Sequence, residues 1–288
     1  MVRLELFTEL GYEVSAPGAD FIFNIQAART ARQNVVAESL VLNQPVQSSE
    51  YADPATLSRF LRLRAQPGWF LLRYTAVVEL THFEAQPTQL PELSSLAVPG
   101  EVLPYLVPSR YCQSDRLLNL AGHEFGHLPL GYSRAKAICD WVHKHVAFQG
   151  NTSNSNTSAL DTLIERVGVC RDFAHLMIAL CRAANLPARM ASGMDYGADV
   201  ALGPPDFHAY VEVFLGDRWY IFDPSGTAIP MGFVRFATGR DAADIAFATI
   251  YGGVSAAQPV ISIRAVPNSQ GVVVEPQHVT YALSTDGA

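Results

Sequence analysis

Hydrophobic and polar residues alternate along most of the first 80 positions, and this period of two predicts β-strands. The clearest runs are VRLELFTEL, DFIFNIQA, SLVLNQPV and WFLLRYTAVVEL. Turn-forming pairs interrupt them at Pro17-Gly18, Gln44-Pro45 and Pro67-Gly68. The pattern indicates that the chain begins with an antiparallel β-sandwich.

A proline-rich stretch then separates these strands from a segment with a different period. Its prolines are Pro87, Pro91, Pro99, Pro104 and Pro108. Such a composition is typical of a chain that runs over the surface between domains. Between Ser133 and His145 the apolar residues recur at helical spacing and predict an amphipathic helix. We therefore expect a β-sandwich domain over residues 1–108 and an α+β domain over residues 109–288.

The second domain is predicted to combine helices with an antiparallel hairpin. A polar tract at 151–158 is a predicted loop, and a helix is predicted from about Cys170 to Asn185, where Pro187 ends it. Two strands, 207–214 and 219–223, are joined by Leu-Gly-Asp-Arg and predict a hairpin.

Composition and charge narrow the class of protein. The 288 residues are 49% hydrophobic and 16% charged, which predicts packed globular cores. A net charge of −7 leaves no broad basic surface for nucleic acid or an anionic membrane, so neither is expected as a partner. The N-terminus has no basic, apolar leader and no run reaches about 18 apolar residues, so a cytoplasmic location is expected. The oligomeric state stays open.

One cysteine has a setting that suits chemistry. Cys170 follows Gly168 at the predicted start of a helix. The unpaired N–H groups of a helix start favour a thiolate and also face the position of a developing oxyanion. A lone cysteine is nevertheless most often a small buried hydrophobe, so further residues must decide.

The predicted hairpin supplies two such residues. If Gly216 and Asp217 form a two-residue turn, His208 and Asp223 lie on one face as diagonal neighbours, about 7 Å apart between backbones. A three-residue loop would place them on opposite faces. A thiolate, a proton-shuttling imidazole and an orienting carboxylate are the parts of a cysteine acyl-transfer triad. Cys170, His208 and Asp223 are therefore the candidate catalytic residues.

The motifs around these residues resemble the transglutaminase-like superfamily, which has a papain-like fold. They are GVCRDFA from Gly168, LPAR from Leu186, SG from Ser192, HAYVEV from His208, WYIFDPS from Trp219, GRDAAD from Gly239, and upstream PSRYC from Pro108. The resemblance implies Cys170 as nucleophile, His208 as general base and acid, and Asp223 as the residue that orients the imidazole. It implies a peptide or protein substrate and no cofactor. Tyr210 departs from the pattern, because many members have Trp there.

The first hundred residues resemble the N-terminal region of bacterial members, with weaker motifs. Acyl transfer to a cysteine forms a thioester, and the residues do not determine whether water or an amine resolves it. Hydrolysis is favoured because bacterial branches look like peptidases; the alternatives are a protein-glutamine transglutaminase and a non-catalytic binding scaffold. Phe207, Tyr196 and Trp219 are candidate walls of a substrate groove.

A competing motif lies upstream. His123-Glu124-Phe125-Gly126-His127 satisfies the H-E-x-x-H signature of zinc metallopeptidases. That chemistry requires a continuous helix through both histidines, and the neighbouring Gly122, Gly126, Pro129 and Gly131 disfavour one. No metal is expected, and a short helix or loop is predicted here.

Overall fold

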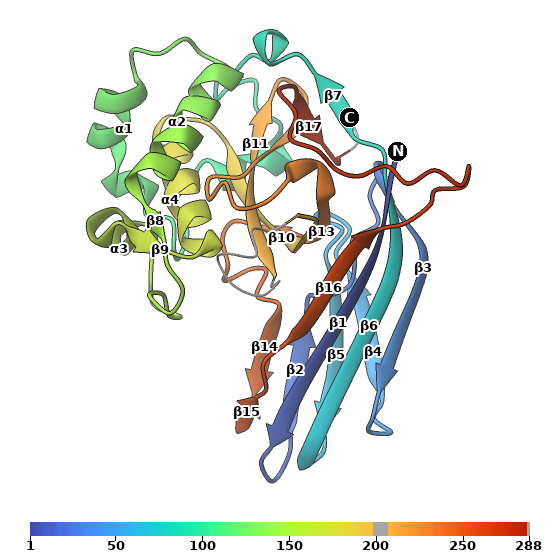
Figure 1. Ribbon diagram of the computed structural model, residues 1–288. Helices are drawn as coiled ribbons and strands as arrows, with labels where there is room; N and C mark the ends of the chain where they lie inside the picture. Colours follow the sequence, from blue (N-terminus) through green and yellow to red (C-terminus); the bar gives the residue numbers. More distant parts are fainter. Residues whose placement is uncertain (198–206, 287–288) are drawn as a thin grey trace.

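A computed structural model describes residues 1–197 and 207–286 of the chain. Two packed antiparallel sheets form the first part of the molecule (Figure 1). In one sheet β1 lies between β6 and the pair β15 and β16, and β3 follows β6; the other has the order β14-β2-β5-β4. The strands are β1 (Val2–Val14), β2 (Ala19–Phe23), β3 (Gln33–Leu42), β4 (Ser48–Ala52), β5 (Arg59–Ala65), β6 (Gly68–Leu80), β14 (Ala248–Tyr251), β15 (Val254–Ala256) and β16 (Val260–Ala265).

The alternation seen in the sequence buries one side of each long strand. Along β1, Leu4 and Leu6 are buried whereas their neighbours are partly exposed. The two sheets meet through aromatic side chains: Phe21 of β2 packs on Tyr12 of β1 at 5.1 Å and on Phe70 of β6 at 5.3 Å between ring centroids. Each fully buried side chain of this size contributes about 1.5–3 kcal/mol. The β-sandwich expected from the sequence is confirmed.

The sandwich is completed by strands from late in the chain. β16 and β15 pair with β1, and β14 pairs with β2. They occupy strand edges that would otherwise expose unpaired N–H and C=O groups. The expected second domain, residues 109–288, thus includes a segment, residues 248–265, that the structure places in the sheets of the first.

The second part is an α+β layer arrangement. Its sheet has the order β12-β11-β10-β13 and is packed against α4, with α1, α2 and α3 around that helix (Figure 1). The elements are α1 (Leu118–Phe125), α2 (Tyr132–His145), α3 (Ala159–Glu165), α4 (Cys170–Ala183), β10 (Ala188–Asp195), β11 (His208–Leu215), β12 (Arg218–Phe222) and β13 (Phe233–Gly239).

A proline-rich segment connects the two parts, and two small strand pairs lie outside the main sheets. The proline-rich segment contains short 3-10 turns and packs Val98 and Val102 against Trp219 of β12. The small pairs are β7 (Phe83–Ala85) with β17 (Ala282–Ser284) and, in parallel, β8 (Ala147–Phe148) with β9 (Val167–Gly168). Among the described residues, no helix has the length and apolar character needed to span a bilayer.

Helix α4 is the centre of the second core. From Asp172 to Ala183 every residue is buried, which suits a helix packed on all sides. Cys170 and Arg171, at its start, are partly exposed. The fold therefore buries the body of the helix and brings its N-terminus to the surface.

Candidate active site

The start of α4 holds Cys170 in a defined position. The carboxylate of Asp172, two residues on, accepts hydrogen bonds from the Val169 N–H at 2.8 Å and from the Ser153 hydroxyl at 2.9 Å. A Cβ on Gly168 would lie 2.7 Å from the Cβ of Asp172, so glycine permits this close approach. The loop at 151–158 and the helix start are thereby fixed together around the thiol.

The other three cysteines have a different environment. Cys112, Cys139 and Cys181 are buried, whereas Cys170 is half-buried. Burial raises the pKa of Cys112 and of Cys139 to about 12, and it also raises the pKa of Cys181. These three remain protonated thiols at neutral pH, so Cys170 is the cysteine suited to nucleophilic chemistry.

The hairpin brings His208 and Asp223 together. Strand β11 pairs with β12 in the predicted register, with Val211 opposite Phe222 and Leu215 opposite Arg218. The Nε2 atom of His208 lies 3.4 Å from Oδ1 of Asp223. The expectation that these two side chains share one face is confirmed.

A turn after β12 holds the Asp223 carboxylate. Its Oδ1 accepts hydrogen bonds from the N–H and the hydroxyl of Ser225, at 3.0 and 2.6 Å, and its Oδ2 accepts one from the Ala228 N–H at 3.2 Å. Burial works to raise the pKa of Asp223, but the contacts with His208, Ser225 and Ala228 outweigh it and lower that pKa. The carboxylate is therefore ionised at neutral pH and fixed against the imidazole.

His208 links this carboxylate to the thiol. Burial disfavours the charged imidazole, yet its contacts with Cys170 and Asp223 raise the pKa of His208 well above its ordinary value. The Cys170 sulfur also lies 4.0 Å from the carbonyl oxygen of Phe207, the residue just before His208. The three candidate catalytic side chains thus converge at the start of α4.

Comparisons with known proteins show the family of this chain. The transglutaminase-like superfamily model matches residues 125–224, and the model of the bacterial transglutaminase N-terminal domain matches residues 2–96. A solved structure, described as that of a proposed cysteine protease from Cytophaga hutchinsonii, is 38% identical, covers 98% of this chain and 97% of its own, and superposes with a TM-score of 0.90. The chain belongs to the transglutaminase-like superfamily.

Two mycobacterial proteins are also similar to this chain. The uncharacterized protein ML0607 of Mycobacterium leprae is 27% identical over 259 residues, which is 85% of this chain and 91% of that protein. The uncharacterized protein Rv2569c of Mycobacterium tuberculosis is 28% identical over 115 residues, 36% of this chain and 37% of that protein. Neither name states an activity.

A second carboxyl group near His208 was not expected from the sequence. Asp195 ends β10, on the same face as Gly193, which is opposite His208. Burial raises its pKa, and its Oδ2 has no hydrogen-bond partner among the described residues. Tyr210 packs its ring 4.6 Å from that of His208. The nearby Ser192-Gly193 motif was the one signal that could have pointed to Asp195.

The remaining family motifs support α4. His175 stacks on Tyr111 at 4.9 Å and accepts a hydrogen bond from the Ala242 N–H at 3.2 Å. Burial lowers the pKa of His175 to about 3, so it is neutral. The Tyr111 N–H in turn donates to Asp241 at 2.9 Å. The motifs at 108–112 and 239–244 therefore brace the helix that carries Cys170.

The three candidate substrate residues have different surroundings. Phe207 and Tyr196 pack against the core of the sandwich. Trp219 lies at the other end of β12 from Asp223, where it contacts Tyr105 at 5.1 Å and the Arg189 guanidinium at 4.2 Å. Trp219 is therefore a core residue beside the linker and is not brought to the thiol.

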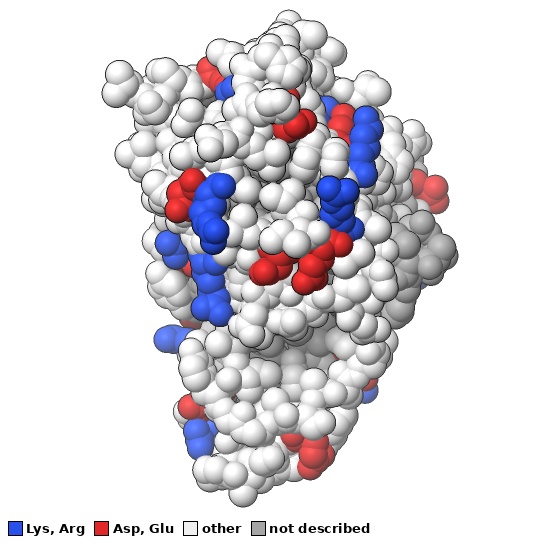
Figure 2. Space-filling view, turned by 90° about the vertical axis from the view of Figure 1, so that its left-hand side faces the viewer, with Lys and Arg blue, Asp and Glu red and all other residues white. Residues whose placement is uncertain are grey.

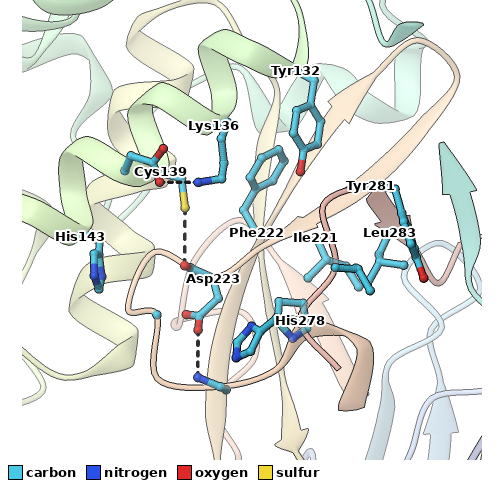
Figure 3. A pocket seen from close by; sticks show the side chains of 15 residues that line it. Tyr132, Lys136, Cys139, His143, Ile221, Phe222, Asp223, His278, Tyr281 and Leu283 are labelled. Carbon is cyan, nitrogen blue, oxygen red and sulfur yellow. Dashed lines mark hydrogen bonds and ion pairs between the residues drawn. The ribbon is translucent and has the colours of Figure 1, made fainter. Parts of the chain in front are cut away.

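A pocket of about 270 Å³ is lined in part by Asp223, and neither Cys170 nor His208 lines it (Figure 3). Side chains of α2, including Lys136 and His143, face His278 and Tyr281 of the C-terminal segment across it. Cys139 donates a hydrogen bond from its Sγ to the backbone carbonyl of Asp223 at 3.5 Å. The pocket adjoins the turn that holds Asp223, and Cys170 is not among its lining residues.

The H-E-x-x-H residues do not form a ligand set. Helix α1 ends at Phe125, so His123 is helical whereas His127 lies beyond the helix. The His123 side chain is 84% exposed and contacts Glu124. Within residues 1–197 and 207–286, no three His, Cys, Asp or Glu side chains are grouped as metal ligands. The glycines at 122 and 126 explain the short helix, as expected.

Proposed function

We propose that this protein hydrolyses amide bonds of peptides or proteins through a thioester on Cys170. Membership of the transglutaminase-like superfamily and the likeness to the Cytophaga hutchinsonii protein support cysteine-dependent acyl transfer. The observation that carries the proposal is a half-buried thiol at a helix start, beside an imidazole that contacts a buried carboxylate. The four cysteines are free thiols, which supports a cytoplasmic protein.

In the first step of the proposed reaction, the Cys170 thiolate attacks the substrate carbonyl carbon. The carbon–sulfur bond forms while the carbonyl electrons move onto oxygen, which the N–H groups at the start of α4 can face. His208, protonated, gives its proton to the leaving amine as the carbon–nitrogen bond breaks, and a thioester remains. Asp223 keeps the imidazole oriented and stabilises its charged form.

Water completes the second step. His208, now neutral, removes a proton from water, and the resulting hydroxide adds to the thioester carbon. The carbon–sulfur bond then breaks, which releases a carboxylic acid and restores the thiolate and the imidazolium. An amine could resolve the same thioester, as in a protein-glutamine transglutaminase. We favour water because the solved structure that matches the whole chain is described as a proposed protease.

The proposal is tested with a library of peptide amides in water enriched in ¹⁸O. Wild type is expected to release peptides that carry one ¹⁸O in the new carboxylate, and Cys170→Ala is expected to lose this activity while staying folded. Cys112→Ala is the matched control, because that thiol is buried and protonated, and we expect its kcat/KM to stay within about threefold. Turnover by the folded Cys170→Ala variant would exclude the proposed nucleophile. Amide products formed with an added amine, in place of ¹⁸O-labelled acids, would exclude hydrolysis as the main reaction.

A further inference from the structure

An exposed aromatic side chain of the sandwich is connected to the thiol through Phe207. Phe247, just before β14, is 42% exposed although it is a large apolar residue. Its ring stacks on that of Phe207 with 4.9 Å between centroids. The carbonyl oxygen of Phe207 is in turn 4.0 Å from the Cys170 sulfur. An extended peptide rises about 3.4 Å per residue, so the Phe247 ring lies within roughly four residues' reach of Cys170.

The sandwich fixes the position of this ring. The carbonyl oxygen of Phe247 accepts a hydrogen bond from the Asn24 N–H at 3.0 Å, and that of Ala246 accepts one from the Asn24 side chain at 3.3 Å. Strand β14 then continues in register along β2. The ring therefore stands on a rigid support and not on a free loop.

One face of β10, in the β12-β11-β10-β13 sheet, packs against two different cores along its length. Met190 and Met194 lie on one face of β10, but Met190 packs in the core around α4 whereas Met194 packs in the sandwich core. The Thr8 hydroxyl of β1 contacts the Met194 sulfur at 3.5 Å. Strand β10 thus contributes to both cores, and Figure 2 shows the surface hollowed at the waist between the two halves of the molecule.

We propose that Phe247, stacked on Phe207, forms an apolar subsite for a large aromatic or aliphatic side chain of the acyl donor peptide. This rests on the proposed function, because the subsite is defined by its position relative to Cys170. A peptide side chain fits better than a larger partner, since the exposed surface is essentially one ring, which stacks on the residue whose carbonyl oxygen lies 4.0 Å from the Cys170 sulfur. Covering an exposed aromatic ring with a second apolar group is favourable both through the hydrophobic effect and through ring packing. The sandwich would then select the substrate.

The test compares peptide amides that differ by Phe or Gly at one of four positions on the acyl side of the scissile bond. With wild type, we expect one position at which Phe raises kcat/KM at least about tenfold over Gly, mainly through KM. Phe247→Ala should reduce this preference to about twofold or less, with the Gly peptide unchanged within about twofold, and Phe247→Leu should keep part of it. Tyr251→Ala is the matched control, because Tyr251 is a 62% exposed aromatic residue at the far end of β14.

Two results would overturn the subsite: turnover with no such preference at any position, or a Phe247→Ala variant that keeps the full preference. Alkylation separates these failures from failure of the proposed function. Selective labelling of Cys170 by iodoacetamide reports the activated thiol without using the subsite. If no peptide is turned over, the proposed function is wrong, and chloromethyl ketones of Phe and Gly peptides then decide the subsite alone. Faster labelling of Cys170 by the Phe reagent, lost in Phe247→Ala, supports it, and equal rates refute it.

Discussion

The clearest effect on stability is expected from Asp286, which completes a buried charge cluster beside the β12-β11-β10-β13 sheet. Its carboxylate pairs with Arg235 at 2.7 Å and with Arg189, and both arginines also pair with Glu212 of the HAYVEV motif. The cluster is neutral, with two arginines and two carboxylates. Burial alone would raise the pKa of Asp286, but the two guanidinium groups outweigh it and hold that pKa well below its usual range.

Asp286→Ala leaves the two arginines of the cluster with only one carboxylate between them. One positive charge is then uncompensated, and the Arg235 side chain is only 1% exposed. Breaking a buried ion pair in this way costs about 3–5 kcal/mol. The Asp286 side chain is 17% exposed, so water can reach the gap and the expected loss is about 3 kcal/mol, a large part of a typical total of about 5–15 kcal/mol. Asp20→Ala is the control, because the Asp20–Arg64 pair is exposed and should lose less than about 1 kcal/mol.

Urea unfolding followed by circular dichroism measures both variants. A folded-state pKa below the unfolded value means that Asp286 contributes stability above the unfolded pKa and loses that contribution as the pH falls toward the folded one. The difference between wild type and Asp286→Ala should therefore be full at neutral pH and shrink in acid. A loss for Asp286→Ala no larger than that for Asp20→Ala, or one independent of pH down to strong acid, would refute this reasoning.

Three further outcomes are expected at the site. His208→Ala should lower kcat/KM by about 10²–10⁴-fold because proton transfer is lost, whereas Asp223→Asn should keep at least about tenfold more activity; equal loss in the two variants would contradict the proposed roles. The pKa of His208 is raised, so kcat/KM for amides should fall only at a pH above the ordinary histidine value of 6.5, where the imidazolium loses its proton. The rate of Cys170 alkylation should not fall in that pH range. A parallel fall of both rates would argue against His208 as the acid. Gly168→Ala should displace the buried Asp172 carboxylate, lower stability by about 1–3 kcal/mol and slow Cys170 alkylation, and unchanged urea unfolding would show that the helix start tolerates the methyl group.

Local pattern predicted two parts of the site, which are the shared face of His208 and Asp223 and the helix start at Cys170. The parity of a hairpin follows from its turn, so the two-residue turn at Gly216 and Asp217 determined that His208 and Asp223 share a face. The start of α4 at Cys170 followed from helix periodicity and the preceding glycine. These are short-range properties of the chain, and the structure agrees with them.

Pairings between distant segments could not be predicted in this way. Strand β16 pairs with β1 although Arg264 and Glu5 are separated by most of the chain. An alternating run shows that a strand exists but not which edge it completes, so the pairing of residues 248–265 with β1 and β2 could not be foreseen. Trp219 was proposed as a groove wall from its residue type, and its position at the far end of β12 could not be read from that. Asp195 lies in no motif, and its proximity to His208 depends on the pairing of β10 with β11.

The central claim is that Cys170 carries the acyl group during turnover. Acid quenching within milliseconds of mixing the protein with an activated peptide ester traps that state, because acylation by an ester outruns hydrolysis of the thioester. Mass spectrometry of the intact protein and of its digest then locates the acyl group, and hydroxylamine tests for a thioester. We expect one acyl mass on the peptide that contains Cys170, removed by hydroxylamine and absent from Cys170→Ala. An acyl group on another residue, or turnover that continues in the folded Cys170→Ala variant, would contradict the claim.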